Sequence, residues 1–343
     1  LPFTQKEVNF SGWAMESRIY AEDPKRGFLP STGRITRYLE PENIENVLID
    51  TGIYEGGEVS MFYDPMVAKV CTTGETREQT IETMKEALAA FIIEGIAHNT
   101  SFLEAILSHP RFAAGDISTN FIEQEYPEGF IGAELTSEVA KVFLGVATTI
   151  FLRDAERAAR ISGQTPGRER AIGSRWVVNV DGQDYPVYVR PDQDQGYFIT
   201  HNRKLISVKT GWTLGRRLFQ AAVNGKSVSV QIRHLEEGYR LTYGGASVAA
   251  RVRTPRVAEL AQFMPKPKNE GRNDALASPI AGLVVSLKVK EGEAVHQGQE
   301  LMVIEAMKME NVIYADHDTT IKKINVGEKE SVAVDQVLME FAA

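Results

Sequence analysis

The chain has 343 residues, of which 43% are apolar and 24% charged, and its formal net charge is -8. This length provides for two or three domains with ordinary cores. An acidic chain without a clustered basic face is not expected to bind nucleic acid. Its single cysteine, Cys71, excludes an intramolecular disulfide and cysteine-pair zinc sites, and it fits a reducing compartment.

Membrane insertion and a histidine metal site are not expected either. The longest nearly apolar stretch, residues 142–152, is too short to cross a bilayer. The six histidines form no H-x-x-x-H pair, so we predict no metal site. The chain begins at Leu1 without a signal-peptide pattern, and we expect it to be the interior of a longer protein.

The first region, residues 1–125, mixes strand and helix patterns. Residues 58–72 are rich in apolar and β-branched side chains, which is typical of strands. Residues 75–95 instead follow a helical period, with apolar positions at Ile81, Met84, Leu88 and Phe91. These patterns predict an α+β domain.

A long amphipathic helix is predicted at residues 134–160. Its apolar residues recur along one stripe: Leu135, Val139, Val142, Phe143, Val146 and Ile150. A charged final part precedes Gly163, which is a usual place for a helix to have ended.

Residues 176–253 contain short alternating runs that predict an antiparallel sheet or barrel. The pairs Asp181-Gly182 and Asn224-Gly225 supply the positive dihedral angles of tight hairpin turns. Residues 265–274 combine proline, charge and glycine, and therefore predict a linker that buries no core.

The last region contains an internal repeat. Residues 282–306, shifted by 37 positions, align without gaps on residues 319–343, and eight of the 25 pairs are identical. Each half is too small to bury its apolar face alone, so the halves are expected to pack as a pair. Lys308 falls at the junction between them, and we expect it at a hairpin tip.

Met307 and Met309 flank Lys308, which a simple solvated charge does not explain. Methionine is soft and adaptable, so a pair of methionines around an amine suits docking to several partner surfaces in turn. The pattern predicts the attachment site of a swinging arm.

The stretch Glu305-Ala306-Met307-Lys308-Met309-Glu310-Asn311 resembles the biotin-attachment signature of biotin carboxyl carrier domains. The resemblance implies that Lys308 carries biotin in amide linkage and that a biotin-protein ligase reads Met307 and Met309. It also implies a small flattened β-barrel of two similar halves. The competing interpretation is a lipoyl carrier domain of the same fold, which usually shows Asp-Lys with acidic neighbours.

A second resemblance covers the start of the chain to about Glu125. Residues 12–24, 28–33 and 63–66 are similar to the C-terminal subdomain of biotin carboxylases. In that family the arginine that aligns with Arg18 lies beside the biotin ureido group and stabilises developing negative charge, for which guanidinium chemistry is suited. Glu16 and Asp64 could orient Arg18 or form a structural ion pair.

The middle of the chain resembles the propionyl-CoA carboxylase α-subunit family. Residues 115–119 and 126–130, the long helix, the β-rich block and the linker follow one another as in that family. There a helix wrapped by an antiparallel barrel, the BT domain, docks onto a carboxyltransferase β subunit. Candidate contact residues, each of which could equally belong to the barrel core, are Trp176, Tyr188, Trp212, Arg216, Arg217 and Phe219.

The resemblances imply an α+β multidomain chain. Its expected parts are a truncated biotin carboxylase C-terminal subdomain (1–125), a helix-plus-barrel BT domain (126–262), a linker (263–275) and a biotin carboxyl carrier domain (276–343). ATP and Mg would be bound by an ATP-grasp part before Leu1, so this chain alone is predicted to be inactive. We expect a hetero-oligomer in the cytoplasm of a bacterium or in the mitochondrial matrix.

The implied function is that of the biotin-carrying α subunit of a ligase that converts propionyl-CoA to methylmalonyl-CoA. One alternative is the α subunit of another acyl-CoA carboxylase, acting on acetyl-CoA or 3-methylcrotonyl-CoA, because acyl selectivity would reside in the β subunit. The other is a carrier and assembly module without a catalytic share.

Overall fold

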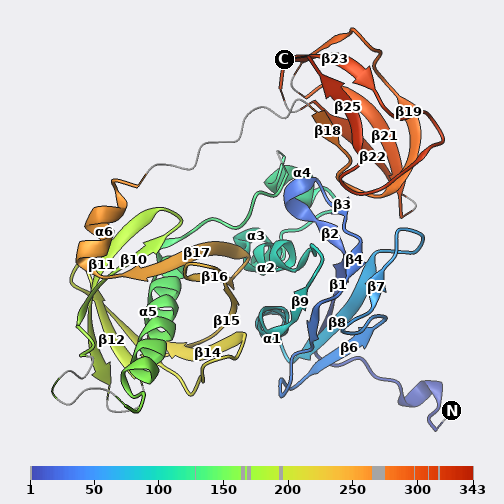
Figure 1. The fold of residues 1–343 in the computed structure, drawn as a ribbon. Coiled ribbons are helices and arrows are strands. Elements are labelled where there is room, and N and C mark those ends of the chain that lie inside the picture. The colour runs from blue at the N-terminus through green and yellow to red at the C-terminus, as the bar shows by residue number, and fades with distance from the viewer. Residues whose placement is uncertain are drawn as a thin grey trace.

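A computed structural model describes residues 2–127, 129–163, 167, 171–192, 196–264, 275–296, 298–307, 309–315 and 317–342. It shows three bodies (Figure 1), which we call the first domain (elements η1 to α4), the barrel domain (α5 to α6) and the carrier domain (β18 to β25). The predicted linker, 265–274, lies outside the described residues. Among the described helices, none is both long and apolar enough to cross a membrane.

The first domain is built on a three-stranded antiparallel sheet, β1-β8-β6, with helix α1 packed on one face. Strand β8 is central, and α1 begins after Thr76, whose side chain accepts a hydrogen bond from the Gln79 N–H at 3.2 Å. The α+β domain predicted for this region is confirmed. Its elements are η1 Gln5–Glu7, β1 Trp13–Tyr20, β2 Glu22–Asp23, η2 Pro24–Arg26, β3 Leu29–Pro30, β4 Gly33–Arg34, β5 Arg37–Leu39, β6 Val47–Thr51, β7 Glu58–Val59, β8 Met66–Gly74, α1 Arg77–Ala90, β9 Ile92–Glu94, α2 Thr100–Ser108, α3 Pro110–Ala114 and α4 Phe121–Glu125.

The barrel domain is a closed antiparallel barrel of eight strands, β10 to β17, around helix α5. Both predicted turns are present, since Asp181 and Asn224 have φ of 46° and 49° and are followed by glycines. Its elements are α5 Ser137–Ala159, β10 Arg175–Val180, β11 Gln183–Asp192, β12 Gly196–His201, β13 Lys204–Lys209, β14 Leu218–Val223, β15 Lys226–His234, β16 Tyr239–Tyr243, β17 Ala246–Arg253 and α6 Pro255–Ala261.

Helix α5 differs from the predicted one-sided helix. Every residue from 142 to 150 is buried, because barrel strands surround the helix instead of covering one stripe. Gly145 lets the helix approach the barrel wall, since an added Cβ would lie 2.8 Å from a methyl group of Val208. The buried hydroxyls of Thr148 and Thr149 donate to carbonyl oxygens one turn earlier, at 2.6 and 2.8 Å, so neither is left unpaired.

Two of the aromatic residues considered for the interface are part of this core. Trp212 is 5% exposed and Phe219 is fully buried, and their rings lie against each other. They are therefore not available as contact residues on the barrel surface. Arg217 is directed elsewhere, to an ion pair with Glu94 of the first domain.

The carrier domain consists of two four-stranded sheets of the same order, β18-β25-β23-β20 and β22-β21-β19-β24. Its strands are β18 Ala275–Ala277, β19 Gly282–Leu287, β20 Ala294–Val295, β21 Glu300–Ala306, β22 Met309–Tyr314, β23 Thr319–Ile324, β24 Ser331–Val332 and β25 Val337–Phe341. A shift of 37 residues places β19 on β23 and β20 on β24, with the same bounds. The predicted pair of half-units, sharing one core, is thereby confirmed.

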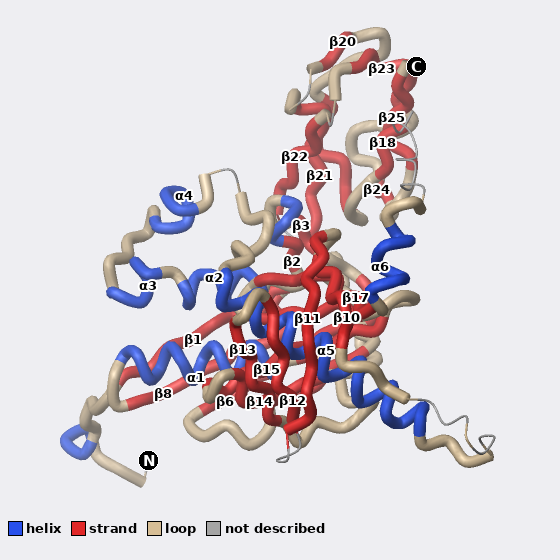
Figure 2. Tube along the Cα trace, turned by 90° about the vertical axis from the view of Figure 1, so that its left-hand side faces the viewer, coloured by secondary structure: helices blue, strands red, loops and turns tan. Residues whose placement is uncertain are grey.

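The carrier domain lies against the first domain. In both views β2 and β3 lie next to the end of the carrier domain where β21 and β22 are drawn (Figures 1 and 2). Leu29 of β3 packs against the carrier core.

Candidate functional site

Arg18 lies on the exposed face of the first-domain sheet, opposite α1. Strand β1 alternates so that Ser17 and Ile19 are buried while Glu16 and Arg18 face outward. The Arg18 Nε donates to Glu16 Oε1 at 2.8 Å, and the Arg18 side chain remains 56% exposed. This hydrogen bond lowers the pKa of Glu16 and raises that of Arg18, so both groups stay charged. The guanidinium is thus held at one edge by Glu16, and a further interaction with the Tyr20 side chain also raises its pKa.

Of the two carboxylates considered as partners of Arg18, Glu16 makes the contact. Asp64 instead accepts a hydrogen bond from the Met66 backbone N–H at 2.9 Å, which shapes the start of β8. The Cys71 thiol lies on the same face and donates to Glu16 Oε2 at 3.8 Å. Burial raises the pKa of Cys71, so this thiol stays protonated and is no activated nucleophile.

The second candidate site is the β21–β22 hairpin of the carrier domain. Ala306 pairs with Met309, so only two residues connect these strands, and Met307 has a φ of 51°, as tight two-residue turns require. Lys308 itself lies outside the described residues. Behind the turn, the Asn311 Nδ2 donates to the Met309 carbonyl at 3.0 Å. The hairpin is therefore short and internally braced.

Gly282 allows a neighbouring strand to lie directly beside this hairpin. A Cβ at this position would come within 2.5 Å of the Glu305 carbonyl oxygen and 2.6 Å of an Ile304 methyl group. Its repeat partner, Thr319, carries a full side chain, so the two halves differ here although their strands match. The glycine that permits the close approach is therefore present only in the first half of the repeat.

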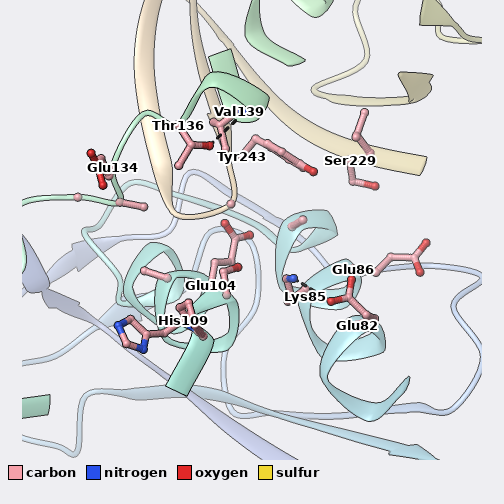
Figure 3. Close-up of a pocket in the computed structure, with 18 of the residues that line it drawn as sticks. Glu82, Lys85, Glu86, Glu104, His109, Glu134, Thr136, Val139, Ser229 and Tyr243 are labelled. Carbon is pink, nitrogen blue, oxygen red and sulfur yellow. Dashed lines mark hydrogen bonds and ion pairs between the residues drawn. The ribbon is translucent and has the colours of Figure 1, made fainter. Parts of the chain in front are cut away.

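A cleft of about 860 Å³ separates the first domain from the barrel domain (Figure 3). Glu104 of α2 is 5% exposed and points toward the barrel hairpin that carries Tyr243, and its Oε2 accepts a hydrogen bond from the Gly245 N–H at 2.6 Å. Burial raises the pKa of Glu104 to about 7. The Glu104 carboxylate binds a backbone N–H of the barrel domain. This contact therefore belongs to the junction between the two domains.

The predicted site residues lie on two domains: Arg18 is on the first domain, and Met307 and Met309 are on the carrier domain. Met307 contacts the first domain, since its backbone N–H donates to the Met61 carbonyl oxygen at 2.9 Å. Sequence reasoning missed Met61, Leu29 and Glu104. No motif marks the first two, because a backbone carbonyl and a half-buried leucine leave no pattern, but a glutamate within the apolar stretch of α2 was a usable signal for Glu104.

Comparison with known families divides the chain in the same way. Residues 16–124 match the biotin carboxylase C-terminal domain, residues 143–266 match the propionyl-coenzyme A carboxylase BT domain, and residues 274–341 match the biotin-requiring enzyme family. Three family models thus match successive parts of the chain, in the order of its three structural domains.

Over almost its whole length the chain is similar to propionyl-CoA carboxylase alpha chains. It is 41% identical to that of Ruegeria pomeroyi, covering 99% of this chain and 53% of the relative, and 33% identical to the mitochondrial human chain, covering 98% and 47%. The chain thus spans about half the length of these relatives. Among solved structures, the biotin carboxylase subunit of pyruvate carboxylase is 37% identical over 37% of this chain and 28% of that chain, with a TM-score of 0.35.

Proposed function

We propose that this chain is the biotin-carrying part of a propionyl-CoA carboxylase α subunit. The observation that carries the proposal is the helix-filled barrel that matches a BT domain and lies between a biotin carboxylase C-terminal domain and a biotin-requiring domain. In the whole enzyme, ATP and bicarbonate would supply a carboxyl group that is transferred to propionyl-CoA, giving methylmalonyl-CoA. The identities of 41% and 33% to propionyl-CoA carboxylase alpha chains support this acceptor.

We assign biotin to Lys308. The surroundings fit such a group, because Lys308 follows Met307 in the short connection between β21 and β22, whose strands are paired as far as Ala306 and Met309. When attached, the ureido ring of biotin accepts a carboxyl group at one site and releases it at another. The carrier domain's own contribution is to hold and move the arm. Met307 and Met309 are proposed to be read by the biotin-protein ligase.

Arg18 is proposed to act at the carboxylation step. Its charged guanidinium lies on an exposed sheet face with Nε bound to Glu16, and a guanidinium presents planar donors that suit an oxyanion. Glu16 is proposed to fix the orientation of that guanidinium. Tethering makes the transfer efficient, because a linked carrier meets this face at high effective concentration.

The remaining assignments concern parts and partners outside this chain. ATP and Mg are proposed to bind to a separate ATP-grasp part, so the chain alone would not carboxylate biotin. We propose the domain limits 1–125, 126–262, 263–275 and 276–343, with the barrel domain contacting a carboxyltransferase β subunit in a hetero-oligomer. Such an assembly would work in a bacterial cytoplasm or a mitochondrial matrix.

The first experiment concerns the modification itself. The chain is produced together with an active biotin-protein ligase, and its intact mass and streptavidin binding are compared before and after Lys308→Arg. Arginine keeps the charge but has no amine that can be acylated. Loss of the biotin mass in Lys308→Arg, with normal labelling of a Lys288→Arg control, supports the proposal. An unmodified Lys308 would refute it.

A second experiment concerns the acyl-CoA. The longer α subunit that contains this chain is copurified with its β subunit, and turnover of propionyl-CoA, acetyl-CoA and 3-methylcrotonyl-CoA is compared. Preference for propionyl-CoA is expected. Preference for either of the others would assign the chain to that carboxylase instead.

A further inference from the structure

The tip of the carrier domain is docked on the first domain. The backbone N–H of Met307 donates to the Met61 carbonyl oxygen at 2.9 Å. Leu29 of β3, also in the first domain, packs against the carrier core. A polar backbone contact at Met307 and an apolar contact of Leu29 with the carrier core thus join the two domains.

One of the two methionines proposed for ligase recognition is buried in this arrangement. Met307 is only 3% exposed, whereas Met309 on the other side of the turn is partly exposed. A hairpin tip is normally the most accessible part of a carrier domain, so burial of Met307 distinguishes this position. A ligase that reads the Met307 side chain cannot reach it in the docked arrangement.

The docking position is connected to the sheet that bears Arg18. Met61 lies in the segment that leads into β8, where Met66 pairs with Tyr20 and Lys69 pairs with Arg18. The docked tip therefore contacts the turn that precedes β8, and Arg18 lies on β1, the strand that pairs with β8. Docking brings the lysine-bearing hairpin to the domain where carboxylation is proposed to occur.

Resting on the proposed function, we infer that Leu29 and the segment 60–62 form a docking surface for the carrier tip, and that docking shields Met307 from the biotin-protein ligase. The carrier domain then has two positions. In the docked position its tip lies beside the Arg18 sheet, and in the released position Met307 is exposed and Lys308 is modified. Biotinylation of the intact chain is thereby limited by release of the carrier domain.

The test uses the intact chain and the variant Leu29→Asp, which places a charge against the apolar carrier core. The matched control is Leu48→Asp, because Leu48 is 62% exposed on β6, and Figure 1 shows β6 away from the carrier domain. Hydrogen exchange of the peptide containing Met307 and the initial rate of biotinylation are measured. Leu29→Asp is expected to increase the rate of hydrogen exchange and the rate of biotinylation by roughly fivefold to tenfold. The reason is that the variant loses part of the free energy of burying one leucine, which stabilises the docked position. Leu48→Asp leaves both unchanged.

A disulfide trap provides a second measurement if Leu29→Asp does not fold. The variant combines Met61→Cys, Met307→Cys and Cys71→Ser, and the 2.9 Å hydrogen bond places the two new cysteines within reach of each other. The oxidised form is expected to be biotinylated at least several-fold more slowly than the same protein after reduction. A pair made from Leu48→Cys and Met307→Cys, also with Cys71→Ser, should not cross-link.

The outcomes separate this inference from the proposed function. If Lys308 is never biotinylated in any form, the proposed function fails. If Lys308 is biotinylated but neither Leu29→Asp nor oxidation of the trap changes its rate, the docking surface is refuted while the carrier function stands. A cross-link between two chains instead of within one would likewise overturn docking within the chain.

Discussion

The Glu104 carboxylate and the Gly245 N–H, 141 residues apart in the sequence, share a hydrogen bond of 2.6 Å across the junction between the first domain and the barrel domain. The Gly245 carbonyl oxygen also accepts a hydrogen bond from the Ala133 N–H at 3.3 Å. The turn of one barrel hairpin is therefore held from two sides by the first domain and its connection. This junction fixes the barrel relative to the domain that bears Arg18.

Replacing Glu104 by glutamine is expected to remove a pH dependence of stability. Burial raises the pKa of Glu104 to about 7, so the folded state binds its proton more tightly than the unfolded state does. The stabilisation is fully present below about pH 4.5 and is lost as the pH rises through about 7. Glutamine keeps an acceptor for Gly245 without a charge, so Glu104→Gln should gain roughly 3 kcal/mol over wild type at pH 8.

Urea unfolding at pH 5.5 and pH 8 measures this effect. Glu86→Gln, a change of an exposed residue lining the same cleft, is the control and should leave the difference between the two pH values unchanged. If Glu104→Gln is no more stable than wild type at pH 8, the folded protein already stabilises the charged carboxylate of Glu104, and the prediction is wrong.

Two adjacent glycines of the same turn provide a matched pair. Gly244 and Gly245 both have positive φ, but a Cβ on Gly245 would lie 2.6 Å from the Ser101 carbonyl oxygen, whereas one on Gly244 meets nothing within 4 Å. Gly244→Ala should cost about 1 kcal/mol for the left-handed backbone alone. Gly245→Ala should cost roughly 3 kcal/mol, because α2 must also move. Equal unfolding free energies for the two variants would show that the junction tolerates the added atom.

The carrier domain could be predicted from sequence in unusual detail because its repeat is a physical constraint. Two chain segments that share apolar positions at a constant offset of 37 adopt matching strands, and even the short pair β20 and β24 follows that offset. The barrel's hairpins were predictable where Asp-Gly and Asn-Gly supplied positive φ. In each case a local requirement of the backbone selects the residue type.

Other features could not be predicted because no local pattern encodes them. The turn between β12 and β13 uses Asn202 and Arg203, with φ of 46° and 62°, and arginine gives no turn signal. Enclosure of α5 on all sides depends on how eight strands close around it, which periodicity along one helix does not reveal. The contact of the carrier domain with the Met61 carbonyl oxygen is made by backbone atoms. Every residue has these atoms, so the sequence does not mark the contact.

Gln231 should couple the unfolding of the first domain to that of the barrel. Its Nε2 donates to the carbonyl oxygens of Ala89 and Phe91, at 3.1 and 2.9 Å, where helix α1 ends. Gln231→Leu keeps the volume but leaves both acceptors without this donor, at a cost of roughly 1–2 kcal/mol. Calorimetry should then show broader or separated transitions. Gln220→Leu, a change of an exposed barrel residue, is the control and should stay within about 0.5 kcal/mol of wild type.

Arg18→Ala tests whether this chain has a catalytic share in the longer enzyme. Removing a donor aimed at developing negative charge typically costs about 10²–10³ in kcat, and we expect a loss of that order in ATP-dependent carboxylation. Biotin content at Lys308 should remain normal, because the variant changes an exposed sheet face and not the carrier domain.

Arg18→Lys should recover only part of the rate, since lysine keeps the charge but not the planar pair of donors. Arg37→Ala is the matched control, because Arg37 is also partly exposed on the first domain and forms an ion pair with Glu55. Full carboxylation by Arg18→Ala would leave the chain with carrier and assembly roles alone. A loss shared equally by Arg37→Ala would indicate a general effect of surface charge, whereas a loss confined to Arg18 requires the guanidinium at that position.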